Sequence, residues 1–126
     1  MKRVLVIEDD HDLSMLFKMA LEISLQDIQV DVAWNGTEGM KRLDESLPDA
    51  IVLDMHLPGV SGNEIYKSLE KRNEAHRVLV CSADVRIVNE YTMRGVNAVE
   101  KPVPMAELTR RVSRIINGIP VAGGFL

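Results

Sequence analysis

Short apolar runs alternate along this chain with stretches in which apolar residues recur every three or four positions. The runs lie at 3–7, 29–34, 50–53, 78–82 and, more weakly, 96–100. A short run that is apolar throughout is typical of a strand buried on both faces. Five such strands, each followed by a helical pattern, predict an α/β protein in which helices cover both faces of a parallel sheet.

The helical patterns predict five amphipathic helices. We expect them over 12–25, from about 37 to 47, over 62–73, over 84–94, and from 104 to about 117. Right-handed crossovers between parallel strands then make a doubly wound sheet the simplest topology. In the first helix the inward stripe should comprise Leu13, Leu16, Phe17, Ala20 and Leu21.

Particular residues are expected to start and pack these helices. Asp10 or Asp12 should cap the first helix, and Thr37 the second. Pro104 suits the first position of the last helix. In the fourth helix the buried face should carry Val85, Val88 and Tyr91.

The length of 126 residues suits one domain with a single layered core. We expect one folded unit over 1–117 and a flexible tail or linker stub over 118–126, which carries several Gly and Pro residues. We expect no DNA-binding module within this sequence, so the chain is expected to be either a single-domain protein or one domain excised from a longer protein.

Charge and composition exclude several function classes. Lys and Arg number 15 and Asp and Glu 19, which gives a net charge of −4, so direct binding to nucleic acid or to an anionic membrane is not expected. The single Cys81 cannot form an internal disulfide. The chain shows neither an export signal nor a membrane-length apolar run, so a cytoplasmic location is expected.

Carboxylates follow two of the predicted strands. Asp54 ends the run AIVLD, and Glu8, Asp9 and Asp10 follow VLVI. A lone aspartate after a strand most often only forms a turn, but parallel strands bring their carboxyl ends to one edge. Two such charges about 4 Å apart repel by roughly 4 kcal/mol, a cost that a cation or a shared proton would relieve. Oxygen ligands in small number favour Mg²⁺.

Two more strand ends complete a chemical pattern. Ser82 ends the fourth apolar run, in VLVCSA, and Lys101 follows the fifth, in VEKPV. An oxygen nucleophile, a metal site, a hydroxyl donor and an ammonium group are what a transferring phosphoryl group requires. Carboxylates are known to form aspartyl-phosphate intermediates. The four strand ends together therefore indicate phosphoryl transfer to Asp54.

At these residues the chain resembles the receiver domain of two-component response regulators. The resemblance rests on the blocks VLVIEDD, IVLDMHLPGVSG, VLVCSA and VEKPV and covers about residues 2–117. It implies a flavodoxin-like fold of five helices and a five-stranded parallel sheet in the order 2-1-3-4-5. It also implies that Asp54 is the phosphoacceptor and takes a phosphoryl group from a phosphohistidine of a sensor histidine kinase or phosphotransfer protein.

The resemblance also assigns the metal ligands. Glu8 and Asp9 correspond to the family's acidic pair, with Asp9 binding Mg²⁺ directly and Glu8 through water. Asp54 and the backbone carbonyl of His56 would complete the protein's ligands, while the His56 imidazole is expected to point outward. Lys101 is implied to be joined to Pro102 by a cis peptide bond, and Ser82 to contact the phosphoryl oxygens.

The resemblance also implies that three positions affect how long the phosphoryl group survives and how its presence is transmitted. His56 and Asp84 lie two residues after the acceptor and two after the hydroxyl residue, where the family controls the attacking water. Ala98 stands where the family usually has Tyr or Phe and has no ring to switch, so either the coupling travels through the backbone of the fourth helix or the output surface responds weakly to phosphorylation. The signal is expected to leave through a surface of residues 84–94, 96–100 and 104–117, which would bind a downstream protein or a second copy.

Two alternatives remain at the level of sequence. A degenerate receiver would bind partners without phosphorylation, an alternative that Ala98 supports. A Mg²⁺-dependent phosphohydrolase of the haloacid dehalogenase type would also use a strand-end Asp, but it needs a second Asp where this chain has His56. The leading prediction is a phosphoacceptor that is not a turnover enzyme.

Overall fold

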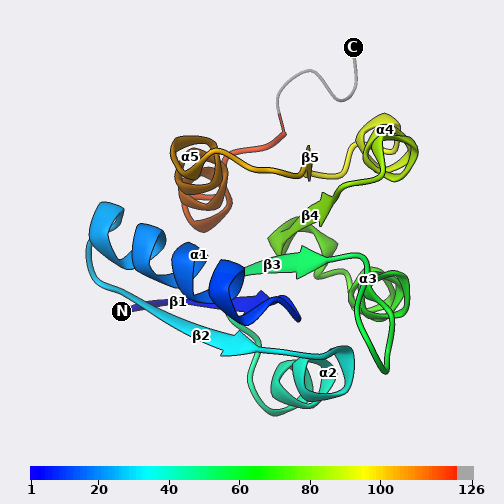
Figure 1. Cartoon of the computed structure of the whole chain (residues 1–126), viewed down its shortest axis with the longest axis horizontal. Coiled ribbons are helices and arrows are strands. Elements are labelled where there is room, and N and C mark those ends of the chain that lie inside the picture. The colour runs from blue at the N-terminus through cyan, green and yellow to red at the C-terminus, as the bar shows by residue number, and fades with distance from the viewer. Residues whose placement is uncertain (122–126) are drawn as a thin grey trace.

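Five parallel strands form one sheet at the centre of the molecule. In the computed structural model, which describes residues 1–121, the strands run in the order β2-β1-β3-β4-β5 (Figure 1). Their bounds are β1 Lys2–Ile7, β2 Ile28–Ala33, β3 Ala50–Asp54, β4 Val78–Ser82 and β5 Ala98–Glu100. The predicted flavodoxin-like sheet with strand order 2-1-3-4-5 is therefore confirmed.

Five α-helices cover the two faces of this sheet. They are α1 His11–Ser24, α2 Gly36–Glu45, α3 Gly62–Lys71, α4 Val85–Met93 and α5 Met105–Ile116, with a short 3-10 helix η1 at Ala75–Arg77 that the sequence pattern did not predict. Figure 1 shows α1 and α5 together on one face and α2, α3 and α4 on the other. Each connection between neighbouring strands is thus a crossover helix, as parallel pairing requires.

A separate apolar core fills each face. On one side Phe17 and Leu21 of α1 pack with Leu108 and Val112 of α5 against β1, β3 and β4. On the other side the core joins the helices α2, α3 and α4 to the opposite face of the same strands. Because β3 and β4 are buried at every residue, they explain the unbroken apolar runs in the sequence.

Side-chain caps fix where four of the helices begin. Asp10, one of two predicted caps, accepts a hydrogen bond from the Leu13 N–H at 3.0 Å. The predicted cap Thr37 is wrong: Asn35 caps α2 by accepting from the Glu38 N–H at 2.7 Å, because the helix already begins at Gly36. Pro104 precedes α5 as its N-cap rather than its first residue.

Two expectations about buried helix faces are also wrong. Leu16 of α1 is 48% exposed and Val85 of α4 is 49% exposed. The spacing of apolar residues defines the buried face of a helix only to within about one position. The sheet covers only the residues near the middle of that face. Tyr91, by contrast, is buried as expected.

The predicted boundary at residue 117 and the tail over 118–126 fall near the end of the described chain. After α5, Gly118 adopts a φ of 69° and the Ile119 N–H donates to the Arg114 carbonyl at 2.9 Å. Residues 122–126, the rest of the predicted tail, lie outside the described residues. Within residues 1–121 we find no helix with the length and apolar character needed to cross a membrane.

Candidate functional site

The acidic residues predicted from the strand ends meet at one edge of the sheet. Asp54 is the last residue of β3, and Glu8 and Asp9 directly follow β1, its neighbour in the sheet. Each of the three offers a carboxylate oxygen, and these oxygens lie within 4.8 Å of one another. Glu8 and Asp54 are buried, with 2% and 4% exposure, whereas Asp9 is exposed. Two buried carboxylates thus face one that solvent can reach.

Lys101 supplies the positive charge at this edge. Its Nζ lies 2.5 Å from Glu8 Oε1 and 3.3 Å from Asp54 Oδ1. The peptide bond from Lys101 to Pro102 is cis, and the Lys101 N–H donates to the Ser82 carbonyl at 2.9 Å. One ammonium group therefore bridges two carboxylates delivered by different strands.

The burial of these charges changes their pKa values. Burial, together with the neighbouring Asp54, raises the pKa of Glu8 to about 7, although the hydrogen bond from Lys101 opposes the shift. For Lys101 burial acts to lower the pKa, but the hydrogen bond that Lys101 donates to Glu8 and the charges of both carboxylates outweigh it and raise the pKa above its usual value. Lys101 therefore stays charged at neutral pH, whereas Glu8 is protonated to a larger extent than an ordinary glutamate.

Ser82 and His56 lie together near Asp54. Ser82 ends β4, and its Oγ accepts a hydrogen bond from the Asp84 N–H at 3.0 Å. The same Oγ lies 3.4 Å from His56 Nε2. His56 is exposed, yet the expectation that its imidazole points outward is wrong, because the ring reaches the hydroxyl. The His56 N–H donates to Asp54 Oδ1 at 3.1 Å.

Asp84 caps α4 beside this group. Its carboxylate accepts from the Arg86 N–H at 2.9 Å, and hydrogen bonds from the Arg86 side chain and backbone lower its pKa. The capping role expected for Asp84 is therefore present. Within residues 1–121, the Asp84 side chain makes no hydrogen bond with Asp54.

The donor set at the strand ends fits a hard divalent cation. Glu8, Asp9 and Asp54 provide carboxylate oxygens only, and small numbers of such ligands suit Mg²⁺, which keeps several waters. The exposed position of Asp9 leaves one side of the cluster open to solvent. The three residues therefore form an acidic cluster typical of a magnesium site.

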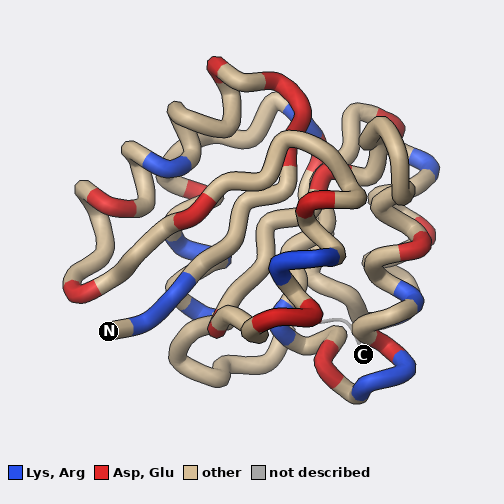
Figure 2. Tube along the Cα trace, turned by 90° about the horizontal axis from the view of Figure 1, so that it is seen from below, with Lys and Arg blue, Asp and Glu red and all other residues tan. Residues whose placement is uncertain are grey.

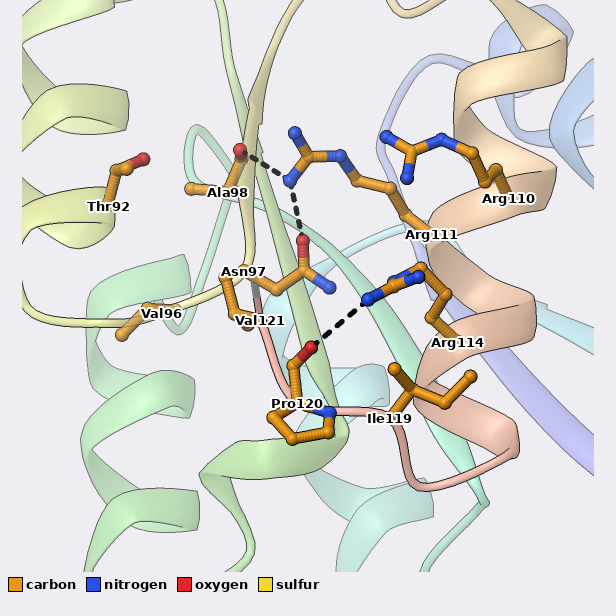
Figure 3. A pocket seen from close by; sticks show the side chains of 10 residues that line it. All are labelled: Thr92, Val96, Asn97, Ala98, Arg110, Arg111, Arg114, Ile119, Pro120 and Val121. Carbon is orange, nitrogen blue, oxygen red and sulfur yellow. Dashed lines mark hydrogen bonds between the residues drawn. The ribbon is translucent and has the colours of Figure 1, made fainter. Parts of the chain in front are cut away.

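Ala98 is the first residue of β5, the strand at one edge of the sheet. It lies beside a hollow of about 250 Å³ (Figure 3). The Arg111 guanidinium of α5 reaches across β5 and donates to the Ala98 carbonyl at 3.1 Å and to Asn97 Oδ1 at 2.7 Å. Arg110 and Arg114 line the same hollow. No large side chain arises from position 98, and an arginine from the next helix holds this part of β5.

Comparison with known proteins identifies the family. A model of the response regulator receiver domain matches residues 4–113. The chain is 34% identical to the phosphate regulon transcriptional regulatory protein PhoB of Rhizobium meliloti, over 90% of this chain and 52% of that protein. It is 32% identical to the transcriptional regulatory protein AfsQ1 of Streptomyces coelicolor, over 92% of this chain and 52% of that protein. The chain spans about half the length of these curated relatives.

Solved structures agree in fold. The receiver domain of the Francisella response regulator 1452 superposes with a TM-score of 0.83 at 27% identity, covering 94% of this chain and 98% of that one. A response regulator receiver domain protein from Clostridium thermocellum superposes with a TM-score of 0.80 at 26% identity, covering 94% and 96%.

The chain belongs to the response regulator receiver domain family. It is a receiver of two-component signalling, a phosphoacceptor domain rather than a turnover enzyme, and receivers of this family partner with histidine kinases. The alternative of a phosphohydrolase with an external substrate is therefore wrong.

Two features of the site were not evident in the sequence. The contact between the His56 ring and Ser82 depends on a rotamer, which no residue pattern encodes. The Arg111 side chain donates a hydrogen bond to the Ala98 carbonyl of β5, although the two residues are 13 positions apart in the sequence. A basic residue at position 111 was visible, but nothing in its spacing indicated which backbone it would reach.

Proposed function

We propose that Asp54 accepts a phosphoryl group from a phosphohistidine of a sensor histidine kinase or phosphotransfer protein. The observation that carries this proposal is the placement of the buried Asp54 carboxylate between the acidic residues after β1 and the ammonium group of Lys101. A carboxylate held by a rigid buried strand is an aimed nucleophile.

The transfer is a displacement at phosphorus. An Asp54 oxygen attacks the phosphorus atom, the P–N bond to the donor imidazole breaks, and the imidazole leaves with the electron pair and takes up a proton from solvent. Lys101 and the Ser82 hydroxyl contact the phosphoryl oxygens and take up their charge. In the later hydrolysis, water attacks the phosphorus of the acyl phosphate, the P–O bond to Asp54 breaks, and inorganic phosphate leaves while Asp54 is regenerated as a carboxylate.

Mg²⁺ is the proposed cofactor. Asp9, Asp54 and the His56 carbonyl would hold it directly, and Glu8 through water. When bound, the ion neutralises charge on the phosphoryl oxygens. The chain's own contribution is to orient the carboxylates, since Lys101 contacts both Glu8 and Asp54 and offsets part of their mutual repulsion.

The outward face of α1 is the proposed docking surface for the phosphodonor. Four large apolar side chains on this helix face solvent, namely Met15, Leu16, Met19 and Ile23, with exposures of 42%, 48%, 55% and 80%. An exposed apolar stripe of this kind marks a contact surface. Since α1 begins two residues after Asp9, a partner helix on this stripe would carry its phosphohistidine to the edge that holds Asp54.

The signal is proposed to leave through α4, β5 and α5, which would contact a downstream protein or a second copy. Acidic and basic residues are interspersed along the trace as a whole (Figure 2). Three arginines of α5, by contrast, line the hollow beside Ala98 (Figure 3). A partner with acidic side chains would complement them.

The experiment is incubation with Mg²⁺ and acetyl phosphate, followed by intact mass measurement and peptide mapping. We expect one phosphoryl adduct, located on Asp54 and absent from Asp54→Asn. The matched control Asp10→Asn keeps a capping side chain and should still form the adduct. If wild-type protein forms no Mg²⁺-dependent adduct and does not bind beryllofluoride, the proposal fails and a degenerate receiver explains the chain better.

The domain limits and location follow as part of the proposal. Residues 1–117 would form the receiver unit, and 118–126 a tail or linker stub. A cytoplasmic location suits a partner of a sensor kinase. Direct binding to nucleic acid is not expected of this unit, whose net charge is −4.

A further inference from the structure

Helix α4 is held to the rest of the protein by few buried side chains. Among its residues, all of which the structure describes, Tyr91 alone is buried. By the same measure α3 buries four residues and α1 three. A helix with so little buried surface is among the elements that move at low cost. The position of α4 therefore depends strongly on the contacts of Tyr91.

The most specific of these contacts reaches α3. The Tyr91 hydroxyl donates to Asn63 Oδ1 at 2.6 Å. Burial raises the pKa of the Tyr91 phenol above its usual value, so it remains a donor at neutral pH. The ring packs edge to face on Tyr66, with the ring centroids 5.0 Å apart, and the Arg94 guanidinium lies 4.8 Å from the Tyr91 centroid.

Asn63 in turn belongs to the part of α3 that touches the phosphoacceptor strand. Its neighbour Gly62 begins α3, and a Cβ atom there would come within 2.6 Å of the Asp54 carbonyl oxygen and of Met55 Cα. The first turn of α3 thus lies directly against the backbone of Asp54. A hydrogen bond to Asn63 therefore connects α4 to the strand end that carries the site.

The other end of α4 is tied to the site through Ser82. The Asp84 N–H donates to Ser82 Oγ at 3.0 Å, and Asp84 is the N-cap of α4. A phosphoryl oxygen that recruits the Ser82 hydroxyl as a donor would reposition this Oγ and weaken its bond to Asp84. The N-terminus of α4 would then be released while Tyr91 still holds the helix to α3.

We propose that the hydrogen bond between Tyr91 and Asn63 is a latch that restrains α4 and sets how strongly phosphorylation of Asp54 displaces this helix. The inference rests on the proposed phosphorylation of Asp54. Tyr91 and Asn63 are positioning residues, since neither touches the acceptor carboxylate. By thermodynamic reciprocity, a restraint that the phosphorylated form must overcome also weakens the binding of a phosphoryl mimic.

The test compares Tyr91→Phe and Asn63→Ala with wild type. Calorimetric titration with beryllofluoride at saturating Mg²⁺ gives the affinity for the phosphoryl mimic. Loss of one hydrogen bond to a neutral partner should raise this affinity about two- to tenfold in either variant. Hydrogen exchange at the amides of 85–93 should become faster in the unliganded variants.

Tyr66→Phe is the matched control. Tyr66 is equally buried, at 3% exposure, and forms the other half of the aromatic pair. Its variant loses the same atom without removing the contact between α3 and α4, so its beryllofluoride affinity should match wild type. The double variant Tyr91→Phe, Asn63→Ala should shift the affinity no more than either single change, because both remove one bond.

The outcomes separate this inference from the proposed function. If wild type binds beryllofluoride and both single variants bind it with unchanged affinity, the latch is overturned and the proposed function stands. A lowered Tm with unchanged affinity likewise overturns the latch, because it shows a packing role alone. If wild type fails to bind beryllofluoride, the proposed function itself fails.

Discussion

The Lys101 ammonium group lies 2.5 Å from Glu8 Oε1, although the two residues are 93 positions apart in the chain. Lys101 also approaches Asp54 at 3.3 Å. Two largely buried carboxylates thus share one ammonium group, which leaves one negative charge uncompensated when both carboxylates are ionised. The stability of the metal-free site and its response to Mg²⁺ should depend on this balance.

Replacement of Lys101 should damage both stability and chemistry. In Lys101→Met the two carboxylates lose their cation, and because removing one member of a buried pair leaves charge uncompensated, we expect a loss of about 3–5 kcal/mol of unfolding free energy at pH 8. Urea unfolding without and with Mg²⁺ measures it, and Mg²⁺ should restore part of the loss. The rate of adduct formation from acetyl phosphate should fall at least tenfold. Unchanged stability and rate in this variant would contradict the proposed role.

Protonation of Glu8 should compete with Mg²⁺. Because folding raises the Glu8 pKa from its usual 4.5 to about 7, the folded protein binds this proton more tightly than the unfolded chain does. The contribution of this proton to the free energy of unfolding is fully present below pH 4.5 and is lost as the pH rises through 7. At pH 8 the carboxylate is ionised in the folded protein, and a cation offsets its burial.

We therefore expect Mg²⁺ to raise Tm more at pH 8 than at pH 5.5. Scanning calorimetry at both pH values, with Mg²⁺ and with EDTA, measures the difference. In the Glu8→Gln variant, Tm in EDTA should depend less on pH, and Mg²⁺ should raise Tm by less than in wild type. An equal Mg²⁺ effect at the two pH values would argue against Glu8 as part of the site.

Substitution of Asp84 should lengthen the life of the phosphorylated form. If its carboxylate orients the attacking water, Asp84→Ala slows dephosphorylation severalfold. The same change removes the α4 cap, at a cost of about 1 kcal/mol. Asp84→Asn keeps a capping oxygen without the charge, so it separates the two roles. The measurement is the decay of the Asp54 adduct after the phosphodonor is removed, and an unchanged rate in both variants would refute the idea.

Charge on the outward face of α1 should block phosphotransfer from a protein donor. Met19→Glu leaves the core intact because Met19 is 55% exposed. We expect transfer from a phosphorylated sensor kinase to fall at least tenfold, with labelling by acetyl phosphate unchanged. Lys67→Glu, an exposed position on α3, is the control. Equal kinase transfer in both variants would exclude α1 as the docking surface.

Much of the fold was predictable because each local pattern agreed with its tertiary setting. Strands β3 and β4 are apolar at nearly every position, which indicated burial on both faces. The predictions failed where several local solutions are possible, as at Thr37, since Asn35 can cap the helix two residues earlier. The predicted burial of Val85 was wrong because the apolar spacing of a helix does not specify which of its apolar residues the sheet will cover.

The sequence by itself determined the order of strands and helices and the residues that end the strands, because hydrophobic period and strand-end polarity are local properties of the chain. Parallel pairing then implied that Glu8, Asp9 and Asp54 would share an edge. Only the tertiary structure decided which atoms meet there. Three contacts depend on rotamers and backbone positions that packing across the whole sheet sets. They join Lys101 to Glu8, His56 to Ser82, and Tyr91 to Asn63.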